Sequence, residues 1–425
     1  MSAPTAADVL QEVRFEERLK EVELKVPAAL ALAAQETSLA KRNQVKRKLY
    51  AESELLRVDI EDKLNEHGIE KDWLESPEIA AANAKLNAVR AQLKLDALPM
   101  TKSREEQAYM IARFATFVVV FVGWFSAVFV CIPLRWLHPW LRSIGFKNNQ
   151  LPMDFLSWGV AKLICMVAGA ESYVEGRENL ENLKDSVICM FSHASNLDGF
   201  IVNSSSPVSF KFAAKKSLFM VPFMGWASRW GFGFVAIDRS NRKRALQSLK
   251  EMAEAVDKYG RSLAISPEGT RSKDGQLQEF KKGPFYLRDD TKKNVLPAIV
   301  FGAYELWPPG RLFSMPGRTM VRFLPEFVPD PSKNRNQNRL ELRRIYLRAF
   351  AEDVPSDVGS AADITGVLKN LLTLYLIWCI TLKVTWTSLS ITNAVCAFLG
   401  ISFWTYAKLS CVWIVALEVL MFFTC

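Results

Sequence analysis

Residues 187–200 read VICMFSHASNLDGF, a short apolar run followed by a polar stretch with one histidine and one aspartate. The run 187–191 is typical of a buried strand. On one continuous helix His193 and Asp198 would point about 140° apart, so the two side chains can meet only if the chain turns between them. A strand, a short loop and a helix that begins near Asn196 supply that turn. The stretch therefore predicts a strand–loop–helix unit that pairs an imidazole with a carboxylate.

Strand-like runs and helical segments alternate beyond this unit. The further strand-like runs are 210–214, 232–237, 262–266, 295–301 and 320–325. A helix is expected between the second and third of these runs, because Ser240 can cap it, Gly260 can end it, and apolar residues between them share one face. Strands that alternate with helices favour an α/β fold, here a mixed sheet flanked by helices.

Two apolar stretches precede this domain. Residues 114–132 contain no charged side chain. As a helix at about 1.5 Å per residue they would be roughly 28 Å long, close to the hydrocarbon thickness of a bilayer. Residues 154–170 are apolar on most faces but carry Lys162, which is typical of a second, shallower membrane helix. The sequence leaves open whether the first stretch spans the membrane or forms a hairpin with the second in one leaflet.

The chain becomes lipid-like again beyond Ile364. Residues 364–388 and 391–424 are dominated by aliphatic and aromatic side chains, with few charges. The second stretch is long for one span, so two shorter helices broken near Lys408 are an alternative. We therefore expect membrane helices both before and after the α/β domain.

Residues 1–108 show the pattern of water-soluble helices. Charged and apolar residues alternate at helical spacing over 7–25, 28–66 and 77–97. The expected helix boundaries are Pro27 between the first two, His67 and Gly68 at the end of the second, and Ser76-Pro77-Glu78 at the start of the third. The first thirty residues contain no apolar core of a secretory signal. The simplest interpretation is a helical hairpin or coiled coil that binds a protein partner or a second copy of the chain.

The composition excludes several classes of protein. The 425 residues carry a formal net charge of +9, and 50% of them are hydrophobic. This share of apolar side chains rules out global disorder. The three histidines are far apart, and the seven cysteines form no Cys-x-x-Cys pair, so no metal site is expected. No basic repeat or reading helix is recognisable, so nucleic acid is not an expected partner. The patterns divide the chain into soluble helices over 1–108, membrane-anchoring helices over 109–175, the α/β catalytic domain over 176–355 and hydrophobic membrane segments over 356–425.

A second polar stretch, SPEGTRS (266–272), directly follows a strand-like run. Gly269 can turn the chain and expose backbone N–H groups to an anion, and the guanidinium of Arg271 fits a phosphate. The alternative is an ordinary polar turn with a solvated arginine. Basic residues also follow two other runs, at Lys215 and Arg239. Open α/β sheets bind ligands beyond the carboxyl ends of their strands, so we expect these groups to form a phosphate-binding edge.

These blocks together resemble the glycerolipid acyltransferases of the 1-acylglycerol-3-phosphate O-acyltransferase (lysophosphatidic acid acyltransferase) family. The resemblance covers roughly 185–330. The blocks, in family order, are SHASNLD, AAKKSLF, GFVAIDRS, SPEGTRSKDG followed by FKKGPF, and LPAIVFGAYELWPPG. Several blocks in the family's order form a much more specific signal than the His-x4-Asp spacing by itself.

The resemblance implies roles for single residues. His193 is expected to be the general base for the acceptor hydroxyl, and Asp198 its orienting partner. Glu268, Gly269, Thr270 and Arg271 fall on the acceptor-binding block, with Arg271 as the phosphate ligand. Lys215 and Arg239 match further basic positions assigned to the phosphate, and Pro297 falls on a hydrophobic block that shapes the site and the acyl-donor pocket. Family members use acyl-CoA as co-substrate, or acyl carrier protein in bacteria, and need no metal or other cofactor.

Three positions depart from the common family pattern. Ser192 stands where many relatives have Asn, Ser266 where many have Phe, and only Pro297 remains of a frequent proline pair. None of these departures removes a reacting group, but all three bear on the identity of the acceptor.

The sequence thus predicts a membrane-bound acyltransferase that moves a fatty acyl group from acyl-CoA to the 2-hydroxyl of lysophosphatidic acid, giving phosphatidic acid. Glycerol-3-phosphate or another lysophospholipid is the alternative acceptor. A serine hydrolase is disfavoured because no Gly-x-Ser-x-Gly motif occurs. A catalytically silent membrane scaffold that recruits partners through residues 1–108 is the alternative from another class. The expected location is the endoplasmic reticulum membrane, with the active site on the cytosolic face.

Overall fold

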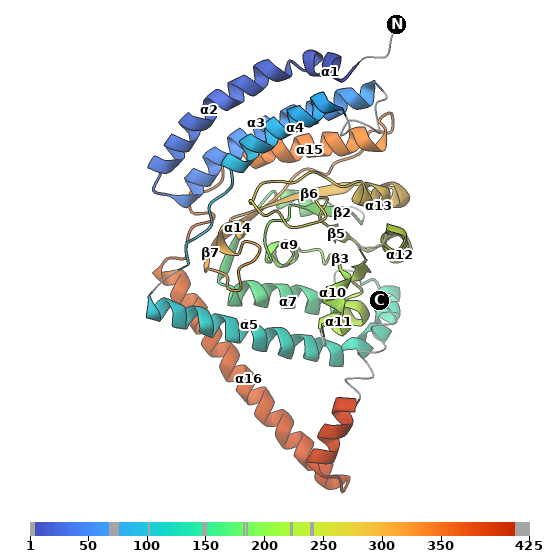
Figure 1. The fold of residues 1–425 in the computed structure, drawn as a ribbon. Helices are drawn as coiled ribbons and strands as arrows, with labels where there is room; N and C mark the ends of the chain where they lie inside the picture. The colour runs from blue at the N-terminus through green and yellow to red at the C-terminus, as the bar shows by residue number, and fades with distance from the viewer. Residues whose placement is uncertain are drawn as a thin grey trace.

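The computed structural model describes residues 5–67, 76–100, 103–146, 151–181, 183, 186–221, 224–238 and 242–412. A sheet lies at the centre of the molecule, helices cover both of its faces, and one long helix extends away from the body (Figure 1).

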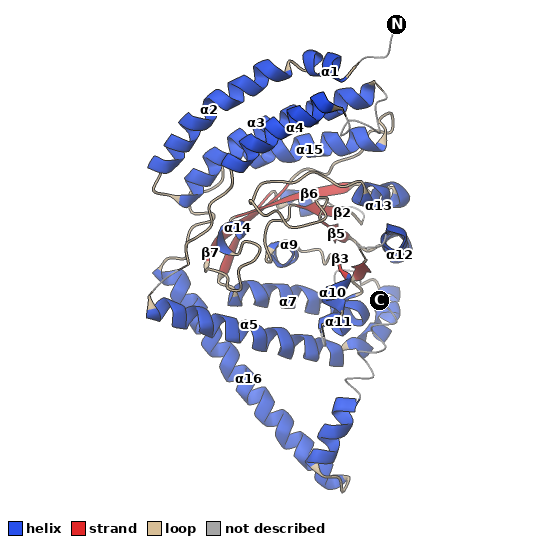
Figure 2. Cartoon of the chain, in the orientation of Figure 1, coloured by secondary structure: helices blue, strands red, loops and turns tan. Residues whose placement is uncertain are grey.

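The central sheet has seven strands in the order β1–β7–β6–β2–β5–β3–β4 (Figure 2). Their bounds are β1 Ala170–Glu175, β2 Ile188–Phe191, β3 Lys211–Lys215, β4 Val235–Ile237, β5 Leu263–Ile265, β6 Val295–Phe301 and β7 Gly317–Phe323. Neighbouring strands are parallel except for the antiparallel pair of β6 and β7. Every residue of β6 is buried, as expected for a strand covered on both faces. The predicted α/β fold, with a mixed sheet flanked by helices, is confirmed.

The strands lie close to the predicted runs, with two differences. The run 232–237 contributes only β4, because Ala227–Phe232 form a π-helical segment (η3) and Gly233 turns the chain with φ +72°. The sequence pattern did not predict β1, which forms the edge of the sheet and pairs with β7. Edge strands are half-exposed, so the sequence of β1, AESYVE, carries no continuous apolar run.

One layer of helices covers the face of the sheet that points toward the long C-terminal helix (Figure 1). Helix α7 (Pro152–Val167) packs against α9 (Asp198–Ser205) and β1, and α5 (Arg104–Val130) packs against the other side of α7. Residues 154–170 thus form most of α7 and the start of β1, and one face of α7 packs against the protein. The apolar residues of α7 recur at helical spacing on one buried face, at Met153, Val160, Ile164 and Val167.

Helices from both ends of the chain cover the opposite face. Helix α15 (Arg335–Ala351) packs against α3 (Leu39–Glu66), and α2 (Phe15–Gln35) and α4 (Pro77–Gln92) pack around α3 (Figure 1). The short α1 (Ala6–Glu12) contacts α2, α3 and α4. The N-terminal region is helical, as predicted, but its helices form a layer of the domain instead of a free-standing hairpin.

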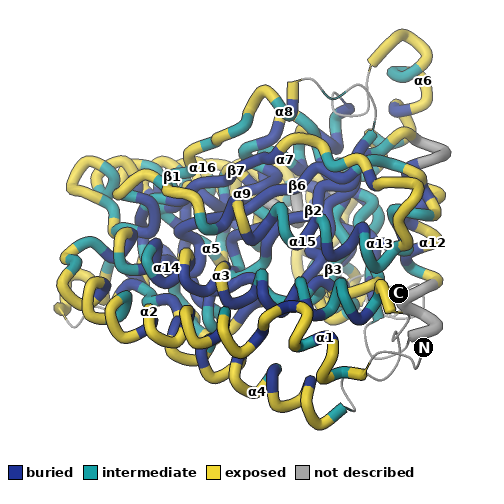
Figure 3. Tube along the Cα trace, turned by 90° about the horizontal axis from the view of Figure 1, so that it is seen from above, coloured by how far each residue is buried: buried dark blue, intermediate teal, exposed yellow. Residues whose placement is uncertain are grey.

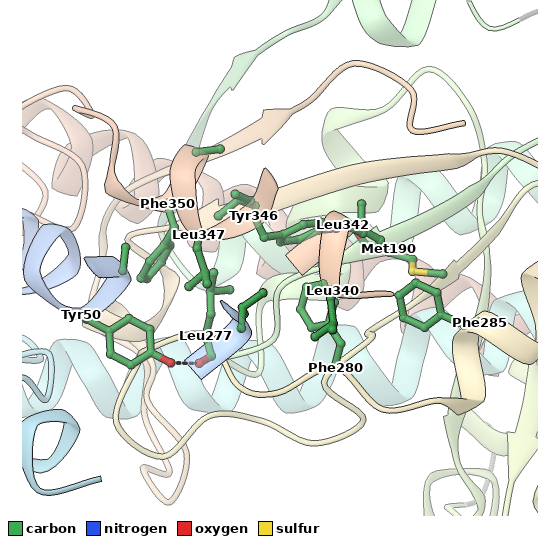
Figure 4. Close-up of a cluster of buried hydrophobic side chains, with 14 of the residues drawn as sticks. Tyr50, Met190, Leu277, Phe280, Phe285, Leu340, Leu342, Tyr346, Leu347 and Phe350 are labelled. Atoms are coloured by element: carbon green, nitrogen blue, oxygen red, sulfur yellow. Dashed lines mark hydrogen bonds between the residues drawn. The ribbon is translucent and has the colours of Figure 1, made fainter. Parts of the chain in front are cut away.

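A common apolar core joins this layer to the sheet. Tyr50 and Leu86 of the N-terminal helices belong to the same buried cluster as Met190 and Ile299 of the strands. In Figure 4 the hydroxyl of Tyr50 donates a hydrogen bond to the backbone oxygen of Leu277 at the edge of this cluster. Buried positions gather on the strands and on the inward faces of the helices, whereas the outer sides of α2 and α4 are exposed (Figure 3).

The helix boundaries in the N-terminal region differ from the prediction at one proline. Helix α2 continues through Pro27 and ends at Gln35, so Pro27 does not separate two helices. Pro27 is exposed, so water can satisfy the backbone carbonyl that lacks a partner, while Val26 beside it is buried. The predicted end of α3 at His67 and the predicted start of α4 at Ser76-Pro77 are confirmed; Gly68 lies outside the described residues.

Short helical segments fill the remaining connections of the described chain. They are η1 Ile132–Leu137, α6 His138–Ser143, α8 Glu178–Glu181, α10 Lys216–Phe219, α11 Met224–Trp226 and α14 Ala303–Leu306. The longer α12 (Arg242–Tyr259) and α13 (Gly283–Thr291) pack against each other. Gly260 follows α12 with φ +57°, as predicted, and the predicted cap Ser240 lies outside the described residues.

Among the described residues, two helices are long and apolar enough to cross a membrane. They are Arg104–Gly123 within α5 and the whole of α16 (Ile364–Phe398). Helix α16 is one continuous helix, so the predicted boundary near 388–391 is wrong. Gly400, with φ +65°, follows it, and a second helical segment over 403–412 includes Lys408. The break falls at the glycine instead of at Lys408 because only glycine adopts this backbone conformation without strain.

Polar contacts attach α16 to the body of the protein near its start. The side-chain amide of Asn370 donates to the backbone oxygen of Met166 at 2.6 Å, and Tyr109 donates to the Asn370 oxygen at 2.6 Å. About two helical turns further along α16, the indole N–H of Trp378 donates to Thr116 Oγ1 at 2.9 Å. Beyond these contacts α16 leaves the body with apolar side chains exposed, as a lipid-facing helix does.

A buried ion pair connects the N-terminal layer, helices α1 to α4, to the sheet domain. Arg47 of α3 pairs with Glu305 of α14, and their side chains are only 2% and 1% exposed. Asn43 donates a second hydrogen bond to the same Glu305 oxygen at 2.8 Å. Removing one partner of a buried ion pair leaves the other charge buried without a counter-charge. This lowers the free energy of unfolding more than the loss of a surface ion pair does.

We predict that Arg47→Met lowers the free energy of unfolding by about 3–5 kcal/mol, because Glu305 stays buried without its cation. Thermal and denaturant unfolding of the purified protein in detergent measure this. The control is Lys25→Met, which removes an exposed pair with Glu52 and should cost less than about 1 kcal/mol. Equal stability of the two variants would contradict the prediction.

Candidate active site

The predicted contact between His193 and Asp198 is present. His193 lies two positions after β2, and Asp198 is the first residue of α9. His193 Nδ1 and Asp198 Oδ2 are 2.9 Å apart, and the same oxygen accepts backbone N–H bonds from Ala194 at 2.7 Å and Ser195 at 2.6 Å. The helix begins at Asp198 instead of Asn196, so the carboxylate sits at the helix start, where it reaches back over the loop.

This geometry sets the protonation pattern of the imidazole. A carboxylate only accepts hydrogen bonds, so Nδ1 must carry the proton that it shares with Asp198. The lone pair of a neutral imidazole then lies on Nε2. The side chain of His193 is 26% exposed while that of Asp198 is 1% exposed, so the base is accessible and its partner is shielded. The pair can therefore take a proton from a hydroxyl that approaches Nε2.

Glu268 ties the loop after β5 to this pair. One carboxyl oxygen accepts the backbone N–H of His193 at 2.7 Å, and the other accepts the N–H of Gln278 at 2.9 Å. The side chain is 1% exposed, and burial raises the pKa of Glu268 to about 8 although both N–H donors favour the charged form. Glu268 thus fixes the backbone of His193 and of Gln278 through its two carboxyl oxygens.

The rest of the SPEGTRS stretch forms a tight turn above Glu268. Gly269 has φ +74°, and its N–H bonds the backbone oxygen of Ser266 at 3.2 Å. The turn leaves Thr270 and Arg271 exposed. The guanidinium of Arg271 donates to the side-chain oxygen of Asn196, within the loop between His193 and Asp198. The structure therefore brings the arginine beside the His–Asp pair across 75 residues of sequence.

The backbone of this turn is joined directly to the histidine. The N–H of Ser272 donates to the backbone oxygen of His193 at 2.8 Å. Together with Glu268, this bond places the two polar stretches of the sequence side by side. Parallel pairing of β2 and β5 is the reason, because it puts the carboxyl ends of both strands at one edge of the sheet.

The other predicted site residues are Lys215, Arg239 and Pro297, and those that the structure describes differ in solvent exposure. Lys215 ends β3 at the same edge of the sheet and is exposed, with β5 between its strand and β2. Arg239 lies outside the described residues. Pro297 is buried within β6, beside Met190 of β2, and its carbonyl accepts the N–H of Leu324 at 2.9 Å. Pro297 is thus part of the sheet beneath the His–Asp pair, and not part of the exposed surface around it.

Two serines of the first block hold the loop in place, a role that the sequence pattern did not assign. Ser192 Oγ accepts the N–H of Val300 at 2.9 Å, so the departure from asparagine at this position fastens the end of β2 to β6. Ser195 Oγ donates to the backbone oxygen of Trp307 at 2.8 Å. Both residues are almost fully buried. A serine at the end of a strand could have indicated such an anchoring role for Ser192. Its partner Val300, however, lies more than 100 residues away in the sequence.

A row of aromatic rings leads from the histidine toward helices α5 and α7. The ring of Phe191 lies 5.8 Å from that of His193, and Phe212 lies 5.9 Å from Phe191. Phe234 continues the row at 5.4 Å from Phe212 and also contacts Phe232 at 5.4 Å. Phe232 and Phe234 join an apolar cluster with residues of α5 and α7. One side of the His–Asp pair is therefore polar and basic, and the other side is apolar.

Metal-ligating residues do not gather at this site. Within the described part of the chain, no group of three or more His, Cys, Asp or Glu side chains is arranged to hold a metal ion. The groups available for chemistry at the edge of the sheet are an imidazole, its carboxylate and the basic side chains.

Comparison with known proteins identifies the class to which this fold and site belong. Residues 171–300 match the family model described as Acyltransferase. The 1-acyl-sn-glycerol-3-phosphate acyltransferase of Limnanthes douglasii is 32% identical over 218 residues, which cover 51% of this chain and 72% of that one. The chain therefore belongs to the 1-acylglycerol-3-phosphate O-acyltransferase family, as the sequence blocks predicted.

Other relatives are similar over smaller shares of their length. The chloroplastic 1-acyl-sn-glycerol-3-phosphate acyltransferase of Arabidopsis thaliana is 31% identical over 52% of this chain and 61% of its own. The Saccharomyces cerevisiae enzyme of the same name is 36% identical over 37% of this chain and 52% of its own. The crystal structure of a 1-acyl-sn-glycerophosphate acyltransferase from Thermotoga maritima aligns with a TM-score of 0.43 and 22% identity, over 56% of this chain and 96% of that one.

The raised pKa of Glu268 predicts a pH effect on stability. The folded protein keeps a proton on Glu268 up to about pH 8, whereas the unfolded chain loses it near the ordinary value of 4.5. The stabilisation from this proton is fully present below pH 4.5 and is lost as the pH rises toward 8. The difference in unfolding free energy between the wild type and Glu268→Gln should therefore decrease from pH 4.5 to about pH 8 and stay constant above pH 8.

Thermal unfolding in detergent at a series of pH values between about 5 and 9 measures this difference. Glu279→Gln, which replaces a carboxylate that is 44% exposed on the same loop, controls for the loss of one acidic group. A difference between wild type and Glu268→Gln that does not change with pH would contradict the prediction.

Proposed function

We propose that this protein transfers a fatty acyl group from acyl-CoA to the 2-hydroxyl of lysophosphatidic acid and so makes phosphatidic acid for phospholipid biosynthesis. The observation that carries the proposal is the hydrogen-bonded pair of His193 and Asp198 with Arg271 beside it. Acyl transfer to a phosphorylated alcohol needs a base for the hydroxyl and a cation for the phosphate, and this edge of the sheet offers both. The names of the relatives support the same acceptor.

The proposed reaction uses His193 twice. Nε2 takes the proton of the acceptor hydroxyl while its oxygen attacks the thioester carbon. The tetrahedral intermediate collapses, the carbon–sulfur bond breaks, and the imidazolium returns the proton to the CoA thiolate. Asp198 stabilises the imidazolium through Nδ1 without itself being protonated. The proposal requires no metal and no cofactor besides the acyl-CoA co-substrate.

Basic side chains suit the anionic parts of both substrates. Arg271 offers a planar fork to a phosphate, and Lys215 adds a positive charge at the same edge. We assign Arg239 the same role by its place in the sequence block. Glu268, Gly269 and Thr270 form the turn that presents Arg271. The aromatic row on the other side of His193 suits an acyl chain, and Pro297 supports this region from within the sheet.

The proposed location is a membrane, which agrees with the two candidate membrane helices and with lipid substrates. We further propose the endoplasmic reticulum, with the basic edge of the sheet on the cytosolic side. The net charge of +9 favours a surface that carries anionic lipid.

Replacing His193 tests the mechanism. His193→Ala should lower kcat by about 10²–10⁴-fold with labelled acyl-CoA and lysophosphatidic acid, because the hydroxyl loses its general base. His67→Ala, which removes a partly exposed histidine paired with Glu12 on the N-terminal layer, should keep the wild-type rate. Wild-type turnover by the His193 variant would rule out this mechanism.

Replacing Arg271 tests the acceptor. Arg271→Ala should raise KM for lysophosphatidic acid by about 10–100-fold, the loss expected for a charge-assisted hydrogen bond to a phosphate. Lys273→Ala removes an exposed cation from the same loop and should change KM little. The assay should compare lysophosphatidic acid with glycerol-3-phosphate and with lysophosphatidylcholine. Faster acylation of either alternative would leave acyl transfer intact but replace the named acceptor.

A further inference from the structure

The loop that carries Arg271 is held from two sides. We call residues 266–280 the acceptor loop; none of these residues belongs to a helix or a strand. On one side it bonds the backbone of His193 through Glu268 and Ser272. A loop without secondary structure keeps one conformation only if other contacts offset its conformational entropy. The contacts on the opposite side therefore decide how well the loop is fixed.

The N-terminal helices supply those contacts, beginning with an ion pair. Arg90, in the last turn of α4, donates two hydrogen bonds to Asp274, from Nε at 2.6 Å and from Nη2 at 3.0 Å. Asp274 also accepts from Ser272 Oγ at 2.7 Å and from the N–H of Gln276 at 3.1 Å. One carboxylate thus joins helix α4 to the residue whose N–H bonds the backbone of His193. Bidentate pairs of this kind fix orientation as well as distance.

Backbone contacts reinforce this pair. The N–H of Leu95 donates to the backbone oxygen of Asp274 at 2.9 Å, and the side chain of Gln276 donates to the backbone oxygen of Leu93. Gly275 has φ +79°, a backbone conformation that favours glycine, and a Cβ atom there would lie 2.8 Å from Tyr304 Cδ1 and 2.9 Å from Leu95 Cδ1. The loop is therefore packed closely against Tyr304 and against the segment after α4.

The contact continues along the rest of the loop. Tyr50 of α3 donates its hydroxyl proton to the backbone oxygen of Leu277, a bond drawn in Figure 4. Leu277 and Phe280 lie in the same buried cluster as Leu56 and Leu86 of the N-terminal helices. All of these helices precede residues 171–300, the part of the chain that the family model matches. The chain thus adds its own support to a loop that belongs to the family domain.

We propose that the N-terminal helical layer is part of the acceptor site, and that Arg90 is a positioning residue that fixes Thr270 and Arg271 through Asp274. This inference rests on the proposed function only for the identity of the acceptor. Arg90 does not reach the substrate; it restricts the conformations of the loop that does. Preorganising a binding loop strengthens binding because less entropy is lost when the ligand binds. The layer therefore has a role inside the enzyme, besides any protein partner that its outer surface binds.

The first test measures the loop itself and needs no activity. In full-length protein in detergent, Arg90→Ala should accelerate hydrogen–deuterium exchange of the amides in residues 269–276, with β2 and α9 unchanged. The matched control is Lys85→Ala on the same helix, which removes a pair with Glu16 of α2 and leaves the loop untouched. Unchanged exchange at 269–276 in Arg90→Ala would overturn the proposal, whatever the acceptor is.

The second test is kinetic. Arg90→Ala should raise KM for the phosphorylated acceptor by about tenfold or more, while KM for acyl-CoA stays near that of Lys85→Ala. Arg90→Lys, which keeps the charge but loses the fork, should recover part of the effect. If KM for both substrates rose equally and the thermal unfolding midpoint fell, Arg90 would have a general structural role, and the proposal would be overturned. A wild-type protein that acylates no lysophospholipid would disprove the proposed function, and the exchange experiment would still decide the role of Arg90.

Discussion

The Oδ2 atom of Asp198 accepts hydrogen bonds from His193 Nδ1 and from the backbone N–H groups of Ala194 and Ser195. Burying a carboxylate is costly unless donors surround it, and here the loop between β2 and α9 supplies them. The same bonds close this loop and leave Nε2 of the histidine as the free base. The local fold and the proposed chemistry therefore depend on one oxygen atom, and all other groups of the site are arranged around it.

The direction of the strands decides which groups can join this pair. β2, β5, β3 and β4 are parallel, so their carboxyl ends lie at one edge of the sheet. This brings the turn with Arg271 and the end of β3 with Lys215 to the side of His193. The antiparallel pairing of β6 with β7 then places β1 on the far edge, away from the site. Basic groups that are scattered along the sequence become neighbours for this geometric reason.

Sequence patterns predicted well those features that depend on neighbouring residues. The strands of the central sheet other than β1, the turn between His193 and Asp198 and the start of α4 at Ser76-Pro77 follow from local periodicity and capping. The same patterns failed where tertiary packing decides. Helix α2 continues through Pro27 because that position is exposed, and one apolar face of α7 packs on α9 and β1. Apolar periodicity does not distinguish a lipid from a protein neighbour.

The sequence by itself determined the α/β fold, the family and the pairing of His193 with Asp198, because short blocks of adjacent residues encode them. Only the tertiary structure decided that Glu268 fixes the backbone of His193 and that Pro297 is part of the sheet. It also decided that the N-terminal helices hold the acceptor loop, since Arg90 and Asp274 are 184 residues apart. No local pattern marks such a pair, because each residue by itself is an ordinary charged side chain. Their contact exists only because α3 and α4 pack over the sheet.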